Sequence, residues 1–156
     1  MAALEAAFWY AKTMKHAKLD DHSYIVRLEL GDDIHESVQS LCARNNISNA
    51  AIQGIGSVDS PTLAHYSIKT KQFTDKRLDG IYEVTSLLGN VALVDGKPFA
   101  HIHVTVSDPN MAAHAGHLVK AACSATLELI VTAYPSHYWK TDDPAVGLKV
   151  WDLAAH

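Results

Sequence analysis

Apolar and polar residues alternate along several segments of the chain, which is the pattern of a β-strand with one face in a core. The clearest case begins at Tyr24. Beyond it, Val26, Leu28 and Leu30 share one face, while charged residues share the other. This segment therefore predicts a strand whose second face is exposed to solvent.

A helical period follows that strand. Asp33 and Glu36 have the spacing of a capping box, in which side chains at a helix N-terminus satisfy free backbone N–H groups. Apolar residues then recur at i, i+4 and i+7 from Ile34. The spacing predicts an amphipathic helix over residues 34–46.

The remaining segments predict strands and turns. The expected elements are a buried strand from Asn49 that runs into a glycine loop at GIGS, a strand over 61–69, a loop over 71–80, consecutive strands over 81–108 with turns or bulges at Gly89-Asn90 and Asp95-Gly96, a strand over 124–133 and a short strand around 148–153. One early helix beside many strands predicts an α+β, sandwich-like fold with a largely antiparallel sheet. We expect residues 1–22 to form an N-terminal arm and residues 23–156 a single domain.

Composition narrows the classes of protein. The chain has 156 residues, of which 48% are hydrophobic and 19% charged, enough for one ordinary core. The formal charge of −4 and the pI near 6.2 argue against a domain that binds nucleic acid by neutralising phosphates alone. No apolar run approaches the roughly 18 residues of a membrane span. Cys42 and Cys123 lack CxxC spacing, so we expect two reduced, buried thiols in a cytoplasmic protein.

Four histidines lie between residues 99 and 122, and two of them share a strand face. His101 and His103 stand at i and i+2, close enough to bind one metal ion. A third ligand could be His117 or His114, from the loop expected after the strand, where Gly116 would permit a tight turn.

Three neutral imidazoles without a thiolate suit zinc, or less specifically nickel, cobalt or copper. A fourth coordination position would remain open, as in catalytic zinc sites. Ligation by neutral imidazole also predicts that metal affinity falls below a pH of about 6.5. The alternative is a polar strand face exposed to solvent.

Two other features suggest chemistry less strongly. The segment GIGSVD at 54–59 has two glycines of a dinucleotide loop, but Asp59 stands where the third glycine would be and no helix pattern follows. The dinucleotide-loop interpretation is therefore weak, and a sharp strand-to-loop turn or close packing across an interface accounts better for these glycines. Glu83 and Glu128 each interrupt an apolar strand. Either carboxylate could lie on a strand face exposed to solvent, or it could contact a metal ligand.

The ordered set of these segments resembles the plants and prokaryotes conserved (PPC) domain, long catalogued as a domain of unknown function. The resemblance runs from Tyr24 to Leu153. It rests on four segments: LELGDDIHESVQSLCARNNIS, IQGIGSVDSPTLAHY, YEVTSLLGNVALVDGKPFAHIHVTVSD and GHLVKAACSATLELIVTA. Members of that family fold as an α/β unit built on an antiparallel sheet, and they assemble as trimers.

Prokaryotic members of that family bind a metal, usually taken as zinc, through an HxH pair and a later histidine in a Gly-Gly-His-Leu stretch. On this sequence the resemblance implies His101, His103 and His117 as ligands, although Ala115 replaces one glycine of the stretch. It favours His117 over His114.

The first hypothesis is therefore a small cytoplasmic homotrimer with a three-histidine zinc site, whose open position holds water or an anionic ligand. If the site is catalytic, hydrolysis or hydration is the natural class, with Glu128 or Glu83 as proton acceptor. The second hypothesis is an assembly or regulatory module that contacts a protein partner or DNA. Plant relatives join this domain to basic AT-hooks, but no such segment occurs here, so we expect no DNA binding and no membrane binding.

Overall fold

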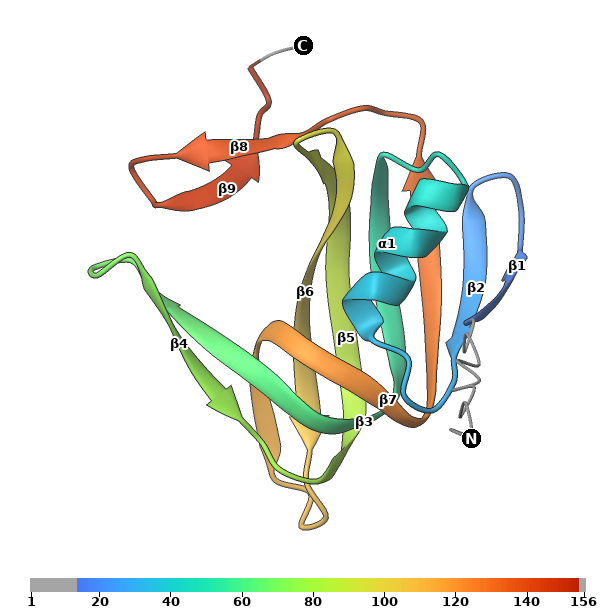
Figure 1. The fold of residues 1–156 in the computed structure, drawn as a ribbon, viewed down its shortest axis with the longest axis vertical. Helices are drawn as coiled ribbons and strands as arrows, with labels where there is room; N and C mark the ends of the chain where they lie inside the picture. The colour runs from blue at the N-terminus through green and yellow to red at the C-terminus, as the bar shows by residue number, and fades with distance from the viewer. Residues whose placement is uncertain (1–13, 155–156) are drawn as a thin grey trace, which may run out of the picture.

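The computed structural model describes residues 14–154, which form one helix and two sheets (Figure 1). The elements are β1 (Lys15–Lys18), β2 (Ser23–Leu28), α1 (Ile34–Arg44), β3 (Asn49–Ser67), β4 (Gln72–Arg77), β5 (Ile81–Val94), β6 (Lys97–Ser107), β7 (Ala113–Tyr134), β8 (Lys140–Asp143) and β9 (Leu148–Trp151). Residues 1–13 of the predicted arm lie outside the described residues. Residues 15–18 of that arm form β1, which pairs with β2.

The predicted helix is confirmed as α1. The side chain of Asp33 accepts a hydrogen bond from the backbone N–H of Glu36, as the capping-box spacing predicts. The helix ends at Arg44, two residues before the predicted end, with Asn45 as its C-cap. Its apolar stripe is fully buried and packs against β6 and β7.

The larger sheet has seven strands in the order β1-β2-β7-β6-β5-β3-β4. All of its strand pairs are antiparallel. The long strand β7 pairs with β6 near its start and with β3 and β2 further along, so the pairings β3–β5–β6–β7–β3 form a closed circuit. This closure brings the first residues of β7 beside β6, where the paired histidines lie.

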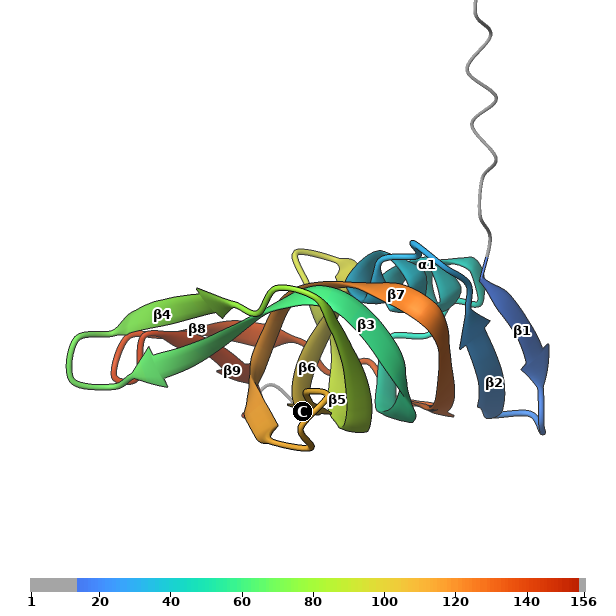
Figure 2. The same cartoon turned by 90° about the horizontal axis from the view of Figure 1, so that it is seen from below.

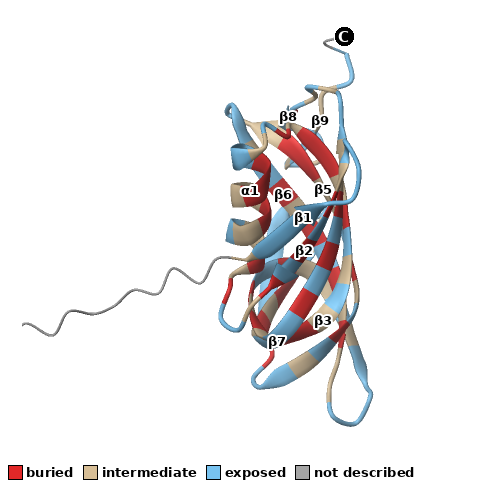
Figure 3. Cartoon of the chain, turned by 90° about the vertical axis from the view of Figure 1, so that its right-hand side faces the viewer, coloured by how far each residue is buried: buried red, intermediate tan, exposed pale blue. Residues whose placement is uncertain are grey.

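The structure is more dominated by sheet than the predicted sandwich-like α+β fold. One helix covers one face of the sheet, and the buried residues lie between them, alternating with exposed residues along the strands (Figure 3). No helix within residues 14–154 has the length and apolarity needed to cross a membrane.

The glycine loop predicted at GIGS is wrong. Gly54 and Gly56 lie inside β3, which continues through Pro61 to Ser67 with register shifts after Gly54 and Gly56. The predicted strands on either side of the glycines are thus one long strand. The dinucleotide-loop interpretation also fails, because a strand rather than a helix follows the glycines.

Gly56 is required by a close approach between β3 and β7. Its φ of +152° is unfavourable for other residues, and an added Cβ would overlap the carbonyl oxygen of Thr126 and lie 2.6 Å from the Cα of Leu127. We expect Gly56→Ala to lower the free energy of unfolding by about 2–4 kcal/mol in urea denaturation. Gly80→Ala is the control, because Gly80 also has positive φ but no atom within 4 Å of an added Cβ, and should cost about 1 kcal/mol. Equal losses in the two variants would contradict the role given to this contact.

Two other sequence predictions are corrected by the sheet. Residues 72–77 form β4 rather than a loop, and every residue of β4 is exposed. A strand that buries neither face shows no apolar alternation, so its sequence looks like a loop. Gly89-Asn90 lies inside β5, whereas Asp95-Gly96 is the turn between β5 and β6, as predicted.

Candidate metal centre

The register between β6 and β7 places two of the predicted histidines opposite each other. Asp108 caps the turn after β6 by accepting hydrogen bonds from the backbone N–H groups of Asn110 and Ala112. Because the hairpin pairs Ser107 with Ala113, counting back along both strands brings His103 opposite His117. Side chains of opposed residues share a face and lie close together.

His101 completes the group, since it lies two residues before His103 on the same face of β6. The ring centroids are 5.1 Å apart for His101 and His103, 5.1 Å for His101 and His117, and 5.4 Å for His103 and His117. One ring nitrogen from each histidine lies within 4.8 Å of the other two.

These three imidazoles could hold one metal ion. Zinc bound to imidazole nitrogens at about 2.0–2.1 Å in a tetrahedral arrangement needs those nitrogens about 3.4 Å apart. Rotations of the rings about their side-chain bonds would bring the nitrogens from within 4.8 Å to that spacing, while the two paired strands hold the Cα atoms. A tetrahedral ion would keep its fourth position open.

Burial keeps two of the rings neutral. Desolvation first, and then the positive charge of Lys140, lower the pKa of His101 to about 4. Desolvation, followed by the charges of His103 and His35, also lowers the pKa of His117, while the charge of Asp75 raises it. Neutral imidazole is the form that binds metals, so protons should compete for these two ligands only below the pH of about 6.5 expected from the sequence.

The depressed pKa of His101 predicts a pH-dependent stability of the metal-free protein. Between pH 6.5 and about 4 the unfolded chain binds a proton at this residue more readily than the folded chain, so folding should weaken as the pH falls through that window. Urea unfolding in the presence of a chelator should give a lower midpoint at pH 5 than at pH 7. His101→Gln should reduce that difference, whereas the exposed His65→Gln should leave it intact. A difference unchanged in His101→Gln would contradict the assignment.

A lysine that the sequence analysis missed lies beside the cluster. Lys140, on β8, is 6% exposed, and its Nζ lies 3.4 Å from Nδ1 of His101. The same Nζ donates a hydrogen bond of 2.9 Å to Oδ1 of Asn90, the residue paired with His101 across β5 and β6. It also lies 5.2 Å from the centre of the Trp151 ring, on β9. Burial lowers the pKa of Lys140.

The segment that carries Lys140 is fixed by Asn49, which is 3% exposed at the start of β3. The Oδ1 atom of Asn49 accepts hydrogen bonds from the backbone N–H of Tyr138 and the hydroxyl of Ser136, and its Nδ2 donates to the carbonyl of Tyr138. A buried asparagine in an apolar strand was the only sequence signal for this anchor. Without the strand pairings, that signal could not be connected to Lys140.

Aromatic side chains lie beside His117. The Phe73 ring, from β4, lies 5.3 Å from that of His117 and 4.8 Å from that of Tyr66. The Tyr66 hydroxyl donates a hydrogen bond of 2.6 Å to the carbonyl of Val146, in the turn between β8 and β9. The β3–β4 and β8–β9 hairpins, which project to the same side of the molecule, are therefore joined near their tips (Figures 1 and 2).

The other residues considered from the sequence lie outside the cluster. His114 contacts Asp108, with its Nε2 at 3.7 Å from Oδ2, and its ring packs against Tyr82. His114 and His117 are three residues apart in one strand, so their side chains point to opposite faces. His117 lies in β7 rather than in a loop, and Gly116 forms no turn. Instead an added Cβ there would lie 2.9 Å from the carbonyl oxygen of Ala64.

Neither predicted proton acceptor belongs to the histidine group. Glu128 pairs with Arg27 across β7 and β2, and Glu83 pairs with Ser107 at the far end of β6 from His101. The sequence showed that both carboxylates interrupt a strand, but only the register shows which part of the sheet each one faces. The expected role of either as proton acceptor at the metal is therefore not supported.

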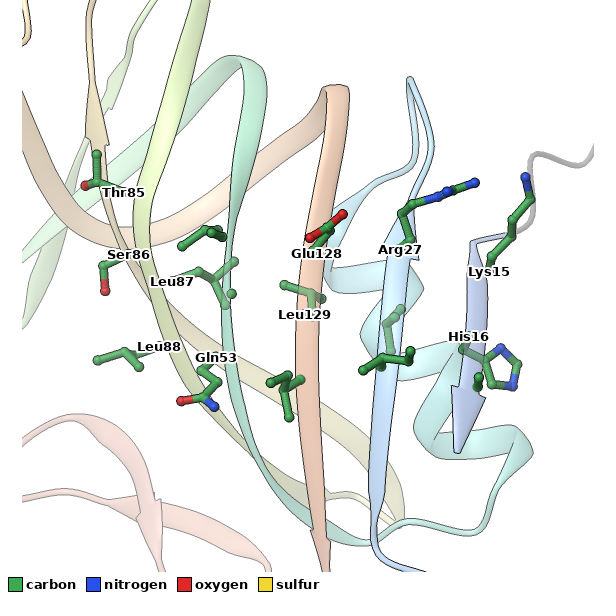
Figure 4. Close-up of a pocket in the computed structure, with 16 residues that line it drawn as sticks. Lys15, His16, Arg27, Gln53, Thr85, Ser86, Leu87, Leu88, Glu128 and Leu129 are labelled. Carbon is green, nitrogen blue, oxygen red and sulfur yellow. The ribbon is translucent and has the colours of Figure 1, made fainter. Parts of the chain in front are cut away.

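An open hollow of about 850 Å³ lies over the sheet and extends from β1 to β5 (Figure 4). A row of paired residues crosses this surface and ends at the histidines. In order, the row comprises Ile25, Ile130, Gln53, Leu88, His103 and His117. Ile55, in the next row, is 61% exposed, and Leu88 is 59% exposed. Exposed apolar side chains that gather in this way indicate an interaction site, and the charged residues Lys15, Arg27 and Glu128 lie among them.

Comparison with known proteins gives one family. The family model described as the Plants and Prokaryotes Conserved (PCC) domain matches residues 16–135. This is the domain that the sequence resembles, abbreviated there as PPC. No curated protein matches the chain.

Solved structures share the fold over nearly the whole chain. A candidate DNA-binding protein from Bacteroides thetaiotaomicron is 28% identical with a TM-score of 0.85, covering 90% of this chain and 97% of that one. A plant- and prokaryote-conserved protein from Pyrococcus horikoshii is 26% identical with a TM-score of 0.78, covering 89% and 94%. A metal-containing protein from Archaeoglobus fulgidus is 28% identical with a TM-score of 0.78, covering 88% and 95%.

Proposed function

Because the chain belongs to the Plants and Prokaryotes Conserved (PCC) domain family, we propose that it is a metal-binding member of that family. In this proposal His101, His103 and His117 hold one zinc ion. The observation that carries it is the convergence of three ring nitrogens within 4.8 Å of one another, from two paired strands. The similar structure of a metal-containing protein from Archaeoglobus fulgidus supports it.

The donor set favours zinc over the hard cations. Imidazole nitrogens suit zinc and its neighbours among the transition metals, whereas magnesium and calcium prefer oxygen ligands. Zinc would act as a Lewis acid toward a ligand in its open position. The protein contributes two rings held neutral by burial and a strand pair that fixes their spacing.

We also propose that the protein is a homotrimer in the cytoplasm, as the family resemblance implies. The exposed apolar residues Ile25, Ile55, Leu88 and Ile130 support self-association, because a second copy would cover a surface that otherwise remains in contact with water. The two cysteines are buried and unpaired, and burial raises the pKa of Cys42 to about 12, as expected for inert thiols in a reducing compartment.

Metal analysis of protein purified without an affinity tag tests the proposed site. We expect about one zinc ion per chain. Protein that remains free of metal after dialysis against micromolar zinc would overturn the proposal.

A second candidate function is DNA binding, which the name given to the similar Bacteroides thetaiotaomicron protein favours. The net charge of −4 weighs against it, because neutralising phosphates is the main source of affinity for DNA. We expect no binding to mixed-sequence duplex DNA in the micromolar range at physiological salt. Binding in that range would favour this second function.

A further inference from the structure

We propose that Lys140 forms half of a binding site for a small carboxylate, which it shares with the metal held by the three histidines. One carboxylate oxygen occupies the open position of the metal, and the other accepts a hydrogen bond from the Lys140 ammonium. The inference rests on the proposed metal site and adds to it the class of ligand and a residue that recognises that ligand.

The first observation is the burial of Lys140 without a carboxylate partner. Its side chain is almost fully enclosed, and its Nζ has one oxygen acceptor, Oδ1 of Asn90. Among residues 14–154, none of the ion pairs within 4.0 Å includes Lys140. The Trp151 ring is the group that partly compensates the charge of the ammonium. A buried ammonium normally has an anionic partner, so this arrangement is incomplete.

The second observation concerns the contact between Lys140 and His101. In the metal-free protein, Nδ1 of His101 lies 3.4 Å from Nζ of Lys140, and it can accept a hydrogen bond from the ammonium only while its lone pair is free. If a metal binds Nδ1, it uses that lone pair. If a metal binds Nε2, the neutral ring carries its proton on Nδ1 instead. Either mode of metal binding therefore removes this acceptor from Lys140.

The positive charges at the proposed site also favour an anionic ligand. Neutral imidazoles add no negative charge, so a zinc dication beside the Lys140 ammonium leaves an excess of positive charge. Asp75, whose charge acts on His117, is exposed to solvent on β4. An anion between the metal and Lys140 would compensate both cations.

A carboxylate fits better than a monatomic anion because it offers two oxygens on one carbon, one for each cation. The Phe73 ring lies beside His117, and the Tyr66 ring lies beside Phe73. They provide apolar surface for the organic part of the ligand. We therefore infer a small organic acid rather than inorganic phosphate.

The test uses full-length protein loaded with cobalt, whose visible absorption reports a change at the open position. Acetate is the probe, with inorganic phosphate as the comparison. Acetate should shift the spectrum of the wild-type protein, and Lys140→Met should raise its dissociation constant about tenfold or more, the loss typical of a charge-assisted hydrogen bond. Lys149→Met is the matched control, because Lys149 lies on β9 and pairs with Asp142 away from the histidines.

Lys140→Arg is the control for an indirect loss of binding through displacement of the β8–β9 hairpin. This variant keeps a cation and should retain acetate binding within a few-fold. If wild-type protein and Lys140→Met both bind cobalt and then bind acetate with equal affinity, the inference is overturned but the proposed metal site is not. Cobalt-loaded wild-type protein that binds phosphate but not acetate would also overturn the inference. A wild-type chain that does not bind cobalt would overturn the proposed metal site, and this inference with it.

Discussion

Replacing His103 with alanine should remove the metal from the purified protein. Zinc content is expected to fall from about one ion per chain to near zero, with at least a ~100-fold loss of affinity, because two imidazoles alone bind zinc weakly and losing even an indirect partner of a ligand costs 10–100-fold. His103 is exposed, so its removal should leave the core and the oligomeric state unchanged. Elemental analysis and light scattering on the same tag-free sample measure both quantities.

The control for this variant is His114→Ala. His114 follows the same turn and was the alternative third ligand, but it contacts Asp108 and Tyr82 on the other face of β7. This variant should keep its zinc. Zinc retained in His103→Ala would show that the metal is held elsewhere, and zinc lost from His114→Ala would contradict the choice of third ligand. Zinc loss that dissociates the oligomer would favour the assembly module over the metal-binding protein.

Replacing Ile55 with aspartate should convert the proposed trimer to monomers. Ile55 is 61% exposed in the hollow, and a carboxylate placed there would be buried in each subunit of the proposed trimer, opposite the like charge of Glu128 on β7. An uncompensated buried charge costs about 3–5 kcal/mol. That cost at each subunit contact should exceed the free energy of association of a small interface. Light scattering measures the mass directly.

Ile68→Asp is the matched control, because Ile68 is 63% exposed but lies outside the hollow, just beyond β3. It should remain trimeric. A trimer that survives Ile55→Asp would place the interface on another surface, and a monomeric wild-type protein would refute the trimer itself. Ile55 does not belong to the histidine cluster, so the monomer formed by Ile55→Asp should still bind zinc unless a neighbouring subunit completes the site.

The sequence predicted the elements whose residues face both the core and solvent. The amphipathic helix from Ile34 and the strand from Tyr24 were recognisable because their periodicity records one buried face. β4 was missed because neither of its faces is buried, and β3 was divided at Gly54 and Gly56 because glycine marks both a loop and a close approach of two backbones. The alternation of apolar and polar residues indicates one buried face. It gives no signal where a strand buries neither face or both faces.

The candidate site was partly recognisable in the same way. The HxH pair identified His101 and His103 from strand geometry alone, but the choice of His117 over His114 needed the family resemblance. Knowledge of the hairpin register would have sufficed, because the turn at Asp108 places position 117 opposite His103. Lys140 could not have been found, since its contact with the cluster spans 39 positions of sequence and depends on the anchor at Asn49.

X-ray absorption spectroscopy at the zinc edge of the tag-free wild-type protein tests the central claim most directly. A site made by His101, His103 and His117 predicts three imidazole nitrogens at about 2.0–2.1 Å and a further oxygen ligand. A shell containing sulfur at about 2.3 Å, or one built from oxygen atoms alone, would contradict it.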